Sequence, residues 1–247
     1  MIACALAVAA GCGRLHFDRS GDAGAVGDAA NDGAASPPSF VQLIGWSNYA
    51  SGTPQHPATT TTRDVLIVLI DINSNTDHIA SVVDDVGDDF VSAGASSTST
   101  MNPGGAVVSE IWYAAGTRGG ATAITVTTAA GAALWDTTLI EFAGVAQVSP
   151  LDRVVTLDNA PDSTTTSNTP AITTTQPDDV IAVINSTTFL GNLVAGSPFA
   201  SYETGANDGI AYLGPATTPG MYEADWDCTM ACGEYNASVV AFKAAQP

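Results

Sequence analysis

Short runs of β-branched and aromatic residues recur along the chain from Phe40 onward, separated by clusters of Gly, Pro, Thr, Asn and Asp. This alternation is typical of strands joined by turns. No segment of the sequence shows a convincing helical period. Charged residues make up only 13% of the chain, and the helix-favouring Lys, Glu, Gln and Arg are scarce. The sequence therefore predicts an all-β fold.

The expected strands fall into two series of similar composition. Those of the first series lie near residues 40–46, 64–71, 79–84, 89–93, 106–114, 121–128 and 136–143. Those of the second series lie near residues 153–157, 171–175, 179–186, 198–203, 208–213, 219–226 and 236–243.

The two series also resemble each other in sequence, which indicates an internal repeat. TTTRDVLIV at 60–68 corresponds to TTQPDDVIAV at 174–183, and IWYA at 111–114 corresponds to IAYL at 210–213. A further match joins TTLIEF, which begins at Thr137, to ASVVAF. We therefore expect an antiparallel β-sandwich, jelly-roll or immunoglobulin-like, built from two internally repeated halves at about 40–145 and 150–247.

The two halves can be arranged in two ways. One sandwich with a single shared core is favoured, because each half alone has short strands and small residues and would form a thin core. The alternative is two tandem immunoglobulin-like domains joined by the Thr- and Ser-rich segment 161–175.

The first eleven residues are small and apolar, and Ala9-Ala10-Gly11 leads directly into Cys12. This segment resembles the lipobox of bacterial lipoproteins. The resemblance implies that 1–11 form a signal peptide and that Cys12 is the lipidated mature N-terminus. Residues 12–38 contain few bulky apolar side chains and predict a disordered tether. The sandwich domain is then expected at 39–247, held at the cell envelope, on the outer membrane or the cell surface.

The domain has a further resemblance over its whole length. The succession DVLIV, IWYA, TAITVT and LIEFAGV, between Phe40 and Lys243, resembles a β-sandwich module of secreted bacterial and phage-associated proteins of unassigned function. This resemblance implies fold and export, and it implies no reaction.

The cysteines agree with export. Cys4 would leave with the signal peptide and Cys12 would carry lipid, so Cys228 and Cys232 remain as an even pair. An exported protein keeps such a pair oxidised, and we expect a disulfide between them.

The net charge limits the partners of the chain. Six Lys and Arg against 25 Asp and Glu give a formal charge of −19, which repels nucleic-acid phosphates. Expected partners are the membrane, through the lipid anchor, and an extracellular polysaccharide or protein.

Catalytic motifs are weak. The string Gly45-Trp46-Ser47-Asn48-Tyr49 lacks the second Gly of a nucleophile elbow, and His56 and His78 lie in predicted polar loops. Glu110 and Glu141 are candidates for a glycosidase pair, but strand alternation also accounts for carboxylates that simply face water. We therefore assign no catalytic residue.

Two acidic segments invite a metal-site hypothesis. Asp71, Asn73, Asn75 and Asp77 place oxygen-bearing side chains at alternate positions, as calcium loops do, although an EF-hand would have Gly where Thr76 stands. Calcium is thus the one candidate cofactor. The second segment, 84–89, is expected to be a hairpin turn with Gly87 at positive φ.

Among the four tryptophans, which also include Trp46 and Trp135, Trp112 and Trp226 are the candidate ligand-binding residues, because an indole offers a flat apolar face with a polar edge. The sequence favours a lipid-anchored extracellular surface protein with a binding or structural β-sandwich over an enzyme. The alternative function is a secreted carbohydrate-active hydrolase or lyase.

Overall fold

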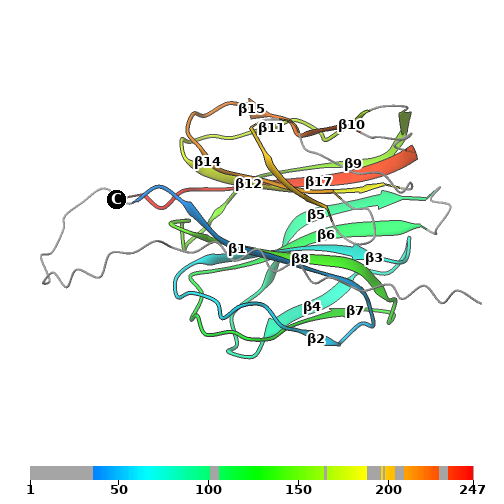
Figure 1. The fold of residues 1–247 in the computed structure, drawn as a ribbon, viewed down its shortest axis with the longest axis horizontal. Coiled ribbons are helices and arrows are strands. Elements are labelled where there is room, and N and C mark those ends of the chain that lie inside the picture. The colour runs from blue at the N-terminus through cyan, green and yellow to red at the C-terminus, as the bar shows by residue number, and fades with distance from the viewer. Residues whose placement is uncertain are drawn as a thin grey trace, which may run out of the picture. The chain divides into compact units, whose positions relative to one another are not determined.

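The computed structural model describes residues 36–100, 106–163, 166–187, 196, 198–203, 209–227 and 233–246. Within these ranges every regular element is a β-strand, and neighbouring strands pair antiparallel (Figure 1). The described part of the chain contains no helix that is long and apolar enough to cross a membrane. The predicted all-β, antiparallel sandwich class is confirmed.

The strands of the first half are β1 (Ser39–Tyr49), β2 (Pro54–Gln55), β3 (Val65–Ile72), β4 (Ile79–Asp84), β5 (Val91–Ser99), β6 (Val107–Ala115), β7 (Ile124–Thr128) and β8 (Leu134–Ala143). Those of the second half are β9 (Leu151–Ser163), β10 (Thr166–Asn168), β11 (Ile172–Thr173), β12 (Asp179–Thr187), β13 (Ala200–Glu203), β14 (Gly209–Ala216), β15 (Met221–Tyr222), β16 (Asp225–Asp227) and β17 (Gly233–Phe242).

Each half contributes one five-stranded sheet. The first sheet has the order β1-β8-β3-β6-β5, and the second, taken from its other edge, has the order β9-β17-β12-β14-β13. We number the five strands of each sheet from one to five in chain order. Across both sheets, from edge to edge, these numbers then run one, five, two, four, three. The two large sheets therefore share one strand order.

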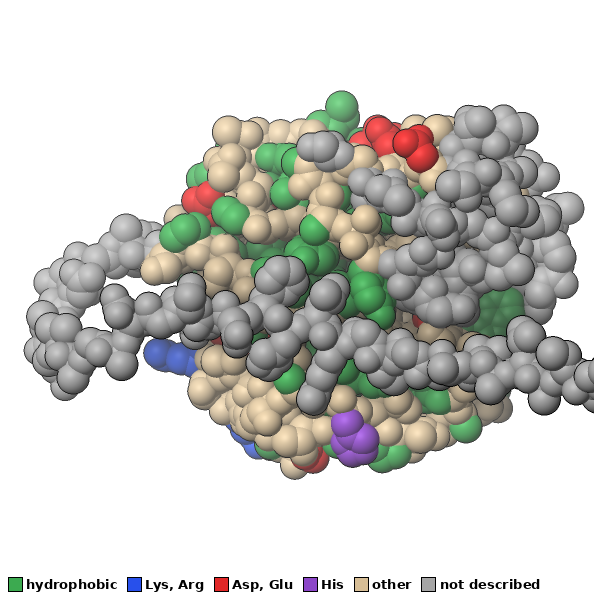
Figure 2. Space-filling model, in the orientation of Figure 1, with side chains coloured by type: hydrophobic (Ala, Val, Ile, Leu, Met, Phe, Trp, Pro, Cys, Tyr) green, Lys and Arg blue, Asp and Glu red, His purple; other side chains and the backbone are tan. Residues whose placement is uncertain are grey.

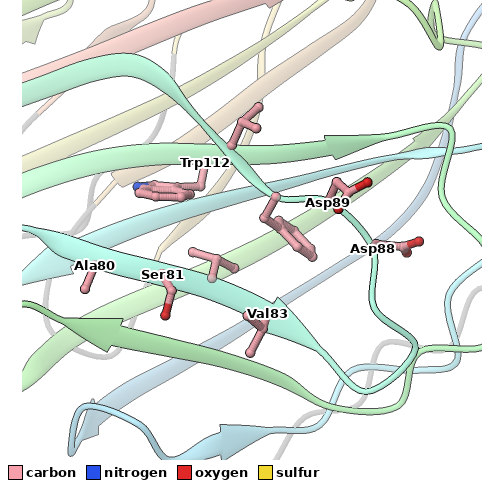
Figure 3. Close-up of a pocket in the computed structure, with 9 residues that line it drawn as sticks. Ala80, Ser81, Val83, Asp88, Asp89 and Trp112 are labelled. Atoms are coloured by element: carbon pink, nitrogen blue, oxygen red, sulfur yellow. The ribbon is translucent and has the colours of Figure 1, made fainter.

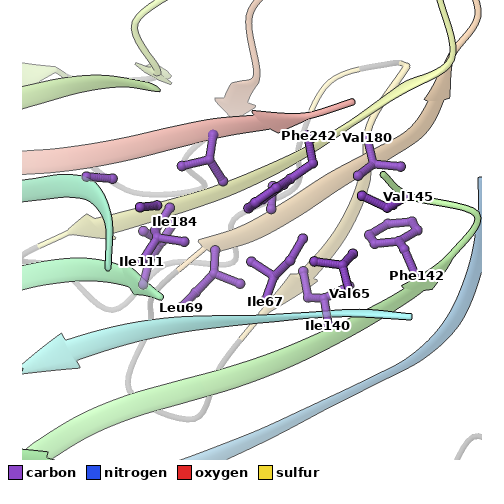
Figure 4. Packing of buried hydrophobic residues seen from close by; sticks show 14 of the residues in the cluster. Val65, Ile67, Leu69, Ile111, Ile140, Phe142, Val145, Val180, Ile184 and Phe242 are labelled. Atoms are coloured by element: carbon purple, nitrogen blue, oxygen red, sulfur yellow. The ribbon is translucent and has the colours of Figure 1, made fainter. Parts of the chain in front are cut away.

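The two large sheets pack face to face and share one hydrophobic core (Figure 4). Side chains on alternate positions of β3 and β12 enter this core, together with Phe142 of β8 and Phe242 of β17. β1 contacts β14, and β5 contacts β9 and β17. The N-terminal strand of each sheet, β1 or β9, therefore contacts a strand of the other sheet, β14 or β5. Such reciprocal contacts resemble those of an isologous dimer interface.

Smaller sheets cover the outer faces of the two large sheets, so that the fold has four layers (Figure 1). β2-β7-β4 covers the first large sheet over one outer core, and the pairs β10-β16 and β11-β15 cover the second over another. All eight residues of β3 are buried, because both of its faces are covered. Segment 161–175 contains strand residues of β9, β10 and β11.

The space between the large sheets is apolar at one end and polar at the other. At the polar end, Ser97 lies 2.9 Å from Ser238, Ser109 lies 3.0 Å from Ser186, and Asn236 donates to Ser109 at 2.7 Å. These side chains are buried, so hydrogen bonds across the interface replace hydrophobic packing there.

Two details differ from the predicted elements. β5 runs well past the predicted 89–93, and the segment after Asp84 is no hairpin, because β4 pairs with β7 whereas β5 pairs with β6. The segment instead carries the chain from the small sheet to the large one. Gly87 does take positive φ, at 82°, as predicted.

Candidate functional site

An open groove of about 560 Å³ lies on the outer side of the first half, between β4 and the start of β5 (Figure 3). Its lining combines one tryptophan, one phenylalanine, small and branched apolar side chains, a hydroxyl and two carboxylates. The lining residues are Ala80, Ser81, Val82, Val83, Asp88, Asp89, Phe90, Val91 and Trp112.

Trp112 reaches the groove from β6. Its cross-strand partners are Val68 of β3 and Ser92 of β5. Because side chains alternate along a strand, Trp112 points to the same outer face as Val68 and packs, half-buried, against the outer core. The structure thus places this predicted ligand-binding residue in the groove.

Glu110 fixes the edge of the Trp112 ring. The indole nitrogen of Trp112 donates to Glu110 Oε2 at 3.0 Å, and Glu110 Oε1 lies 3.0 Å from His78 Nδ1. The backbone nitrogen of Ile79 also donates to Glu110 Oε1, at 3.3 Å. Glu110 is only 6% exposed, whereas most of the His78 side chain is in solvent. This arrangement limits rotation of the ring.

The far end of the groove is acidic. Figure 3 shows Asp88 and Asp89 on the segment that enters β5, away from Trp112. Asp84 Oδ1 accepts the backbone N–H of Gly87 at 2.6 Å and of Asp88 at 2.9 Å. Burial, and the negative charge of Asp84, raise the pKa of Asp88, although the backbone N–H and the charge of Arg118 lower it in part. The carboxylates at this end thus repel one another.

The predicted calcium residues do not converge. Asp71 lies buried on the inner face of β3 and accepts a hydrogen bond from Ser109, whereas Asn73 and Asn75 are exposed. Asp77 accepts the backbone N–H of residues 130 and 132 at 2.8 and 2.9 Å. Burial raises the pKa of Asp77, but these and further hydrogen bonds outweigh burial and lower it. In the described ranges no three His, Cys, Asp or Glu side chains are arranged to hold a metal ion.

The two glutamates considered as a glycosidase pair lie far apart. Glu110 is opposite Ile70 of β3, and Glu141 is opposite Leu66 of the same strand, but from the other side. Four residues along the strand and two strand spacings give a distance of about 16 Å between the Cα atoms of the two glutamates. A glycosidase pair needs about 5–9.5 Å. Glu141 instead accepts the backbone N–H of Thr61 at 2.6 Å.

The residues of a serine hydrolase are not brought together either. Ser47 donates its hydroxyl hydrogen bond to Asp136, and His56 Nδ1 lies 2.9 Å from the carbonyl oxygen of Thr122. His78 contacts Glu110. None of these described contacts joins a serine hydroxyl to a histidine.

Trp226, the second predicted ligand-binding residue, lies in the core. It is fully buried in the outer core of the second half, packed with Val183 and Ala211. Its ring face is therefore unavailable to a ligand. The sequence-based prediction that Trp226 binds a ligand is wrong in this structure. The adjoining acidic stretch gave the expectation, but alternation on β16 points Trp226 inward between the exposed Asp225 and Asp227.

Among the described residues of the second half, the position that corresponds to Trp112 carries no aromatic side chain. Trp112 is opposite Val68, and the corresponding pair on β14 and β12 is Ala211 and Val183. Glu110 likewise corresponds to Gly209. On this side Trp226 of the small sheet occupies the space over Ala211. The groove therefore lies on the first half.

Cys12, the predicted signal peptide, most of the predicted tether, and Cys228 with Cys232 lie outside the described residues. On the face seen in Figure 2, basic side chains occupy only a small area, in keeping with six Lys and Arg in the chain. No protein-family model, curated protein or solved structure matches the chain.

Proposed function

We propose that the chain is a lipid-anchored extracellular surface protein whose β-sandwich binds an extracellular polymer in the Trp112 groove without chemical turnover. The observation that carries this proposal is the indole of Trp112, half-buried in the groove and held by Glu110. A fixed aromatic face loses little conformational entropy on binding, so such residues dominate recognition surfaces.

The positions of the acidic residues support binding over hydrolysis. Glu110 bonds to Trp112, His78 and Ile79, and Glu141 accepts a hydrogen bond from Thr61. The Cα atoms of the two glutamates are about 16 Å apart. The two glutamates are therefore too far apart to act together in glycoside hydrolysis.

The anchor part of the proposal depends on Cys12 and the small apolar residues before it. Mass spectrometry of the mature N-terminus from membrane fractions is expected to find a lipid-modified Cys12. An unmodified Cys12 still joined to Gly11 in the exported protein would refute the anchor. The same sample is expected to contain a Cys228–Cys232 disulfide, and free thiols at both positions would contradict it.

Binding is tested by incubating the full chain with panels of polysaccharides and peptides and measuring both retention and product release. We expect retention without release. Trp112→Ala should lower affinity by about tenfold or more, because it removes the central aromatic contact. Trp135→Ala is the matched control, since Trp135 does not line the groove. Equal affinity of these two variants would refute the groove as the site.

The second candidate function, a carbohydrate-active hydrolase or lyase, makes the opposite prediction. Release of product that disappears in Glu110→Gln or Glu141→Gln would establish turnover, and it would replace the binding proposal.

A further inference from the structure

We infer that the polymer bound in the Trp112 groove is a cationic glycan, a polysaccharide whose sugar rings carry protonated amino groups; this inference rests on the proposed function. It adds a ligand class to the groove, and it follows from the charges, the apolar lining and the strand edges around the groove.

The groove joins an aromatic floor to a concentration of negative charge. Asp88 and Asp89 line it, and Asp84 and Asp85 precede them on the same segment. Arg118 is the cation that contacts this segment, donating from Nη1 to the carbonyl oxygen of Val86 at 3.0 Å. Four carboxylates against one guanidinium attract a cationic ligand and repel an anionic one.

Two buried oxygen atoms at this end have no hydrogen-bond donor in the described part of the chain. They are Oδ2 of Asp84 and Oδ2 of Asp88. Burial and repulsion between these two carboxylates already raise the pKa of Asp88. An ammonium group bound at this end of the groove, beside Asp88 and Asp89, would reduce the repulsion between the carboxylates through its positive charge.

The apolar part of the groove suits a sugar ring. A pyranose has faces of C–H groups that can lie on an indole, and its hydroxyls and amines project from the rim of the ring. Beside Trp112, the groove offers Val83 and Val91, which are 49% and 47% exposed, and the half-buried hydroxyl of Ser81. One ligand that is apolar on its faces and cationic at its rim matches both ends of the groove.

The strand edges beside the groove discourage an extended peptide. β4 and β5 are both edge strands, and a peptide would bind there by adding a strand. The pairing of β5 breaks its register between Ser92 and Ala95, with Gly94 at a φ of 75°, and the pairing of β4 breaks between Ile79 and Ser81. Bulges of this kind interrupt the regular row of backbone groups that strand addition requires.

The test uses the full chain and three oligosaccharide probes of equal length, namely oligomers of glucosamine, of N-acetylglucosamine and of galacturonic acid. Affinity is measured by titration calorimetry at low and high salt and at mildly acidic pH, at which the amino groups of the glucosamine oligomer are protonated. We expect the glucosamine oligomer to bind most tightly and the galacturonate oligomer to bind least. Raising the salt concentration should weaken glucosamine binding selectively, because it screens the acidic end of the groove.

Variants separate the two parts of the groove. Asp89→Asn should weaken glucosamine binding by about two- to fivefold, as expected for one exposed ion pair, and it should leave N-acetylglucosamine binding unchanged. Trp112→Ala should weaken both. Asp225→Asn is the matched control, because Asp225 is exposed on β16 and does not line the groove.

The outcomes distinguish the inference from the function on which it rests. Equal affinity for the charged and N-acetylated oligomers, lost in Trp112→Ala, would overturn the cationic ligand and keep the binding function. Peptide binding that depends on Trp112, with no glycan bound, would do the same. Failure of every glycan and peptide to bind would overturn both.

Discussion

Glu110 holds Trp112 through a hydrogen bond of 3.0 Å between Oε2 and the indole nitrogen, from a position two residues earlier on the same strand. The other carboxylate oxygen of Glu110 contacts His78 and the backbone nitrogen of Ile79 at the start of β4. Glu110 therefore joins the large sheet to the small sheet beside the groove. It is a positioning residue, and its carboxylate does not face water.

Glu110→Ala should destabilise the fold and loosen Trp112. Removing the carboxylate leaves the N–H groups of Trp112 and Ile79 without their acceptor, which costs about 1–3 kcal/mol in the free energy of unfolding. Urea denaturation monitored by tryptophan fluorescence measures the loss. Glu110→Gln should lose less, because the amide keeps one oxygen acceptor.

Glu223→Ala is the control for Glu110→Ala, since Glu223 is exposed and remote in sequence from the groove. If both alanine variants unfold at the same urea concentration, Glu110 does not hold the two sheets together, and the positioning role is wrong.

The two predicted ligand tryptophans should respond oppositely to substitution. Trp226→Ala removes a fully buried ring and should lower the free energy of unfolding by about 3–5 kcal/mol. Trp112→Ala removes a half-buried ring, so it should cost less stability and should abolish most ligand retention. Thermal unfolding and the retention assay, performed on both variants, measure these effects. A ligand-binding loss in a folded Trp226 variant as large as in Trp112→Ala would contradict the core assignment.

The sequence did not predict that Trp226 is buried whereas Trp112 is only half-buried. The correspondence of IWYA with IAYL matches Trp112 with Ala211, and the strand pairing places these two residues opposite Val68 and Val183. The burial of Trp226 depends on which face of a three-residue strand meets the large sheet. Alternation within so short a strand cannot decide that question, since tertiary packing decides it.

Gly214→Ala tests the core that the two halves share. A Cβ at Gly214 would lie 2.8 Å from Phe142 Cε1, in the first half, and 2.9 Å from Val180 Cγ1, in the second. Phe142 and Val180 are fully buried, so the added methyl should cost about 1–3 kcal/mol of unfolding free energy. Gly220→Ala is the control, because a Cβ there meets no atom within 4 Å. Equal thermal midpoints for the two variants would argue against tight packing between the halves.

β5 shows why the sequence located the strands by their apolar runs but underestimated the length of some of them. Its second part, from Ala95 to Ser99, has small and hydroxyl-bearing residues that resemble a loop in sequence. In the structure Ser97 and Ser99 are buried and bond to Ser238 and Glu234 of the other half. A buried polar surface satisfied by a distant segment has no local hydrophobic signal, so it escapes a reading based on periodicity.

Stability should rise as the pH falls from about 7.5 towards 4.5. Asp64 is buried at the start of β3 beside Glu141, and Asp179 is buried at the start of β12 near Asp152. Burial first, and then the neighbouring carboxylate, raise the pKa of each aspartate from 3.8 to about 6. Between these values the folded protein binds more protons than the unfolded chain, so stability decreases as pH rises through this window.

The thermal midpoint, measured from about pH 4.5 to 7.5, checks this dependence. Asp64→Asn combined with Asp179→Asn removes both titrating carboxyls and should flatten the profile, leaving the weaker slope expected from general repulsion in a chain of charge −19. Asp85→Asn is the control. Hydrogen bonds from Thr122 lower the pKa of Asp85 to about 2, so this carboxylate stays ionised over the whole range, and its removal should shift every midpoint by a similar amount. A double variant that keeps the full slope of the natural protein would show that the two buried aspartates do not titrate in this window.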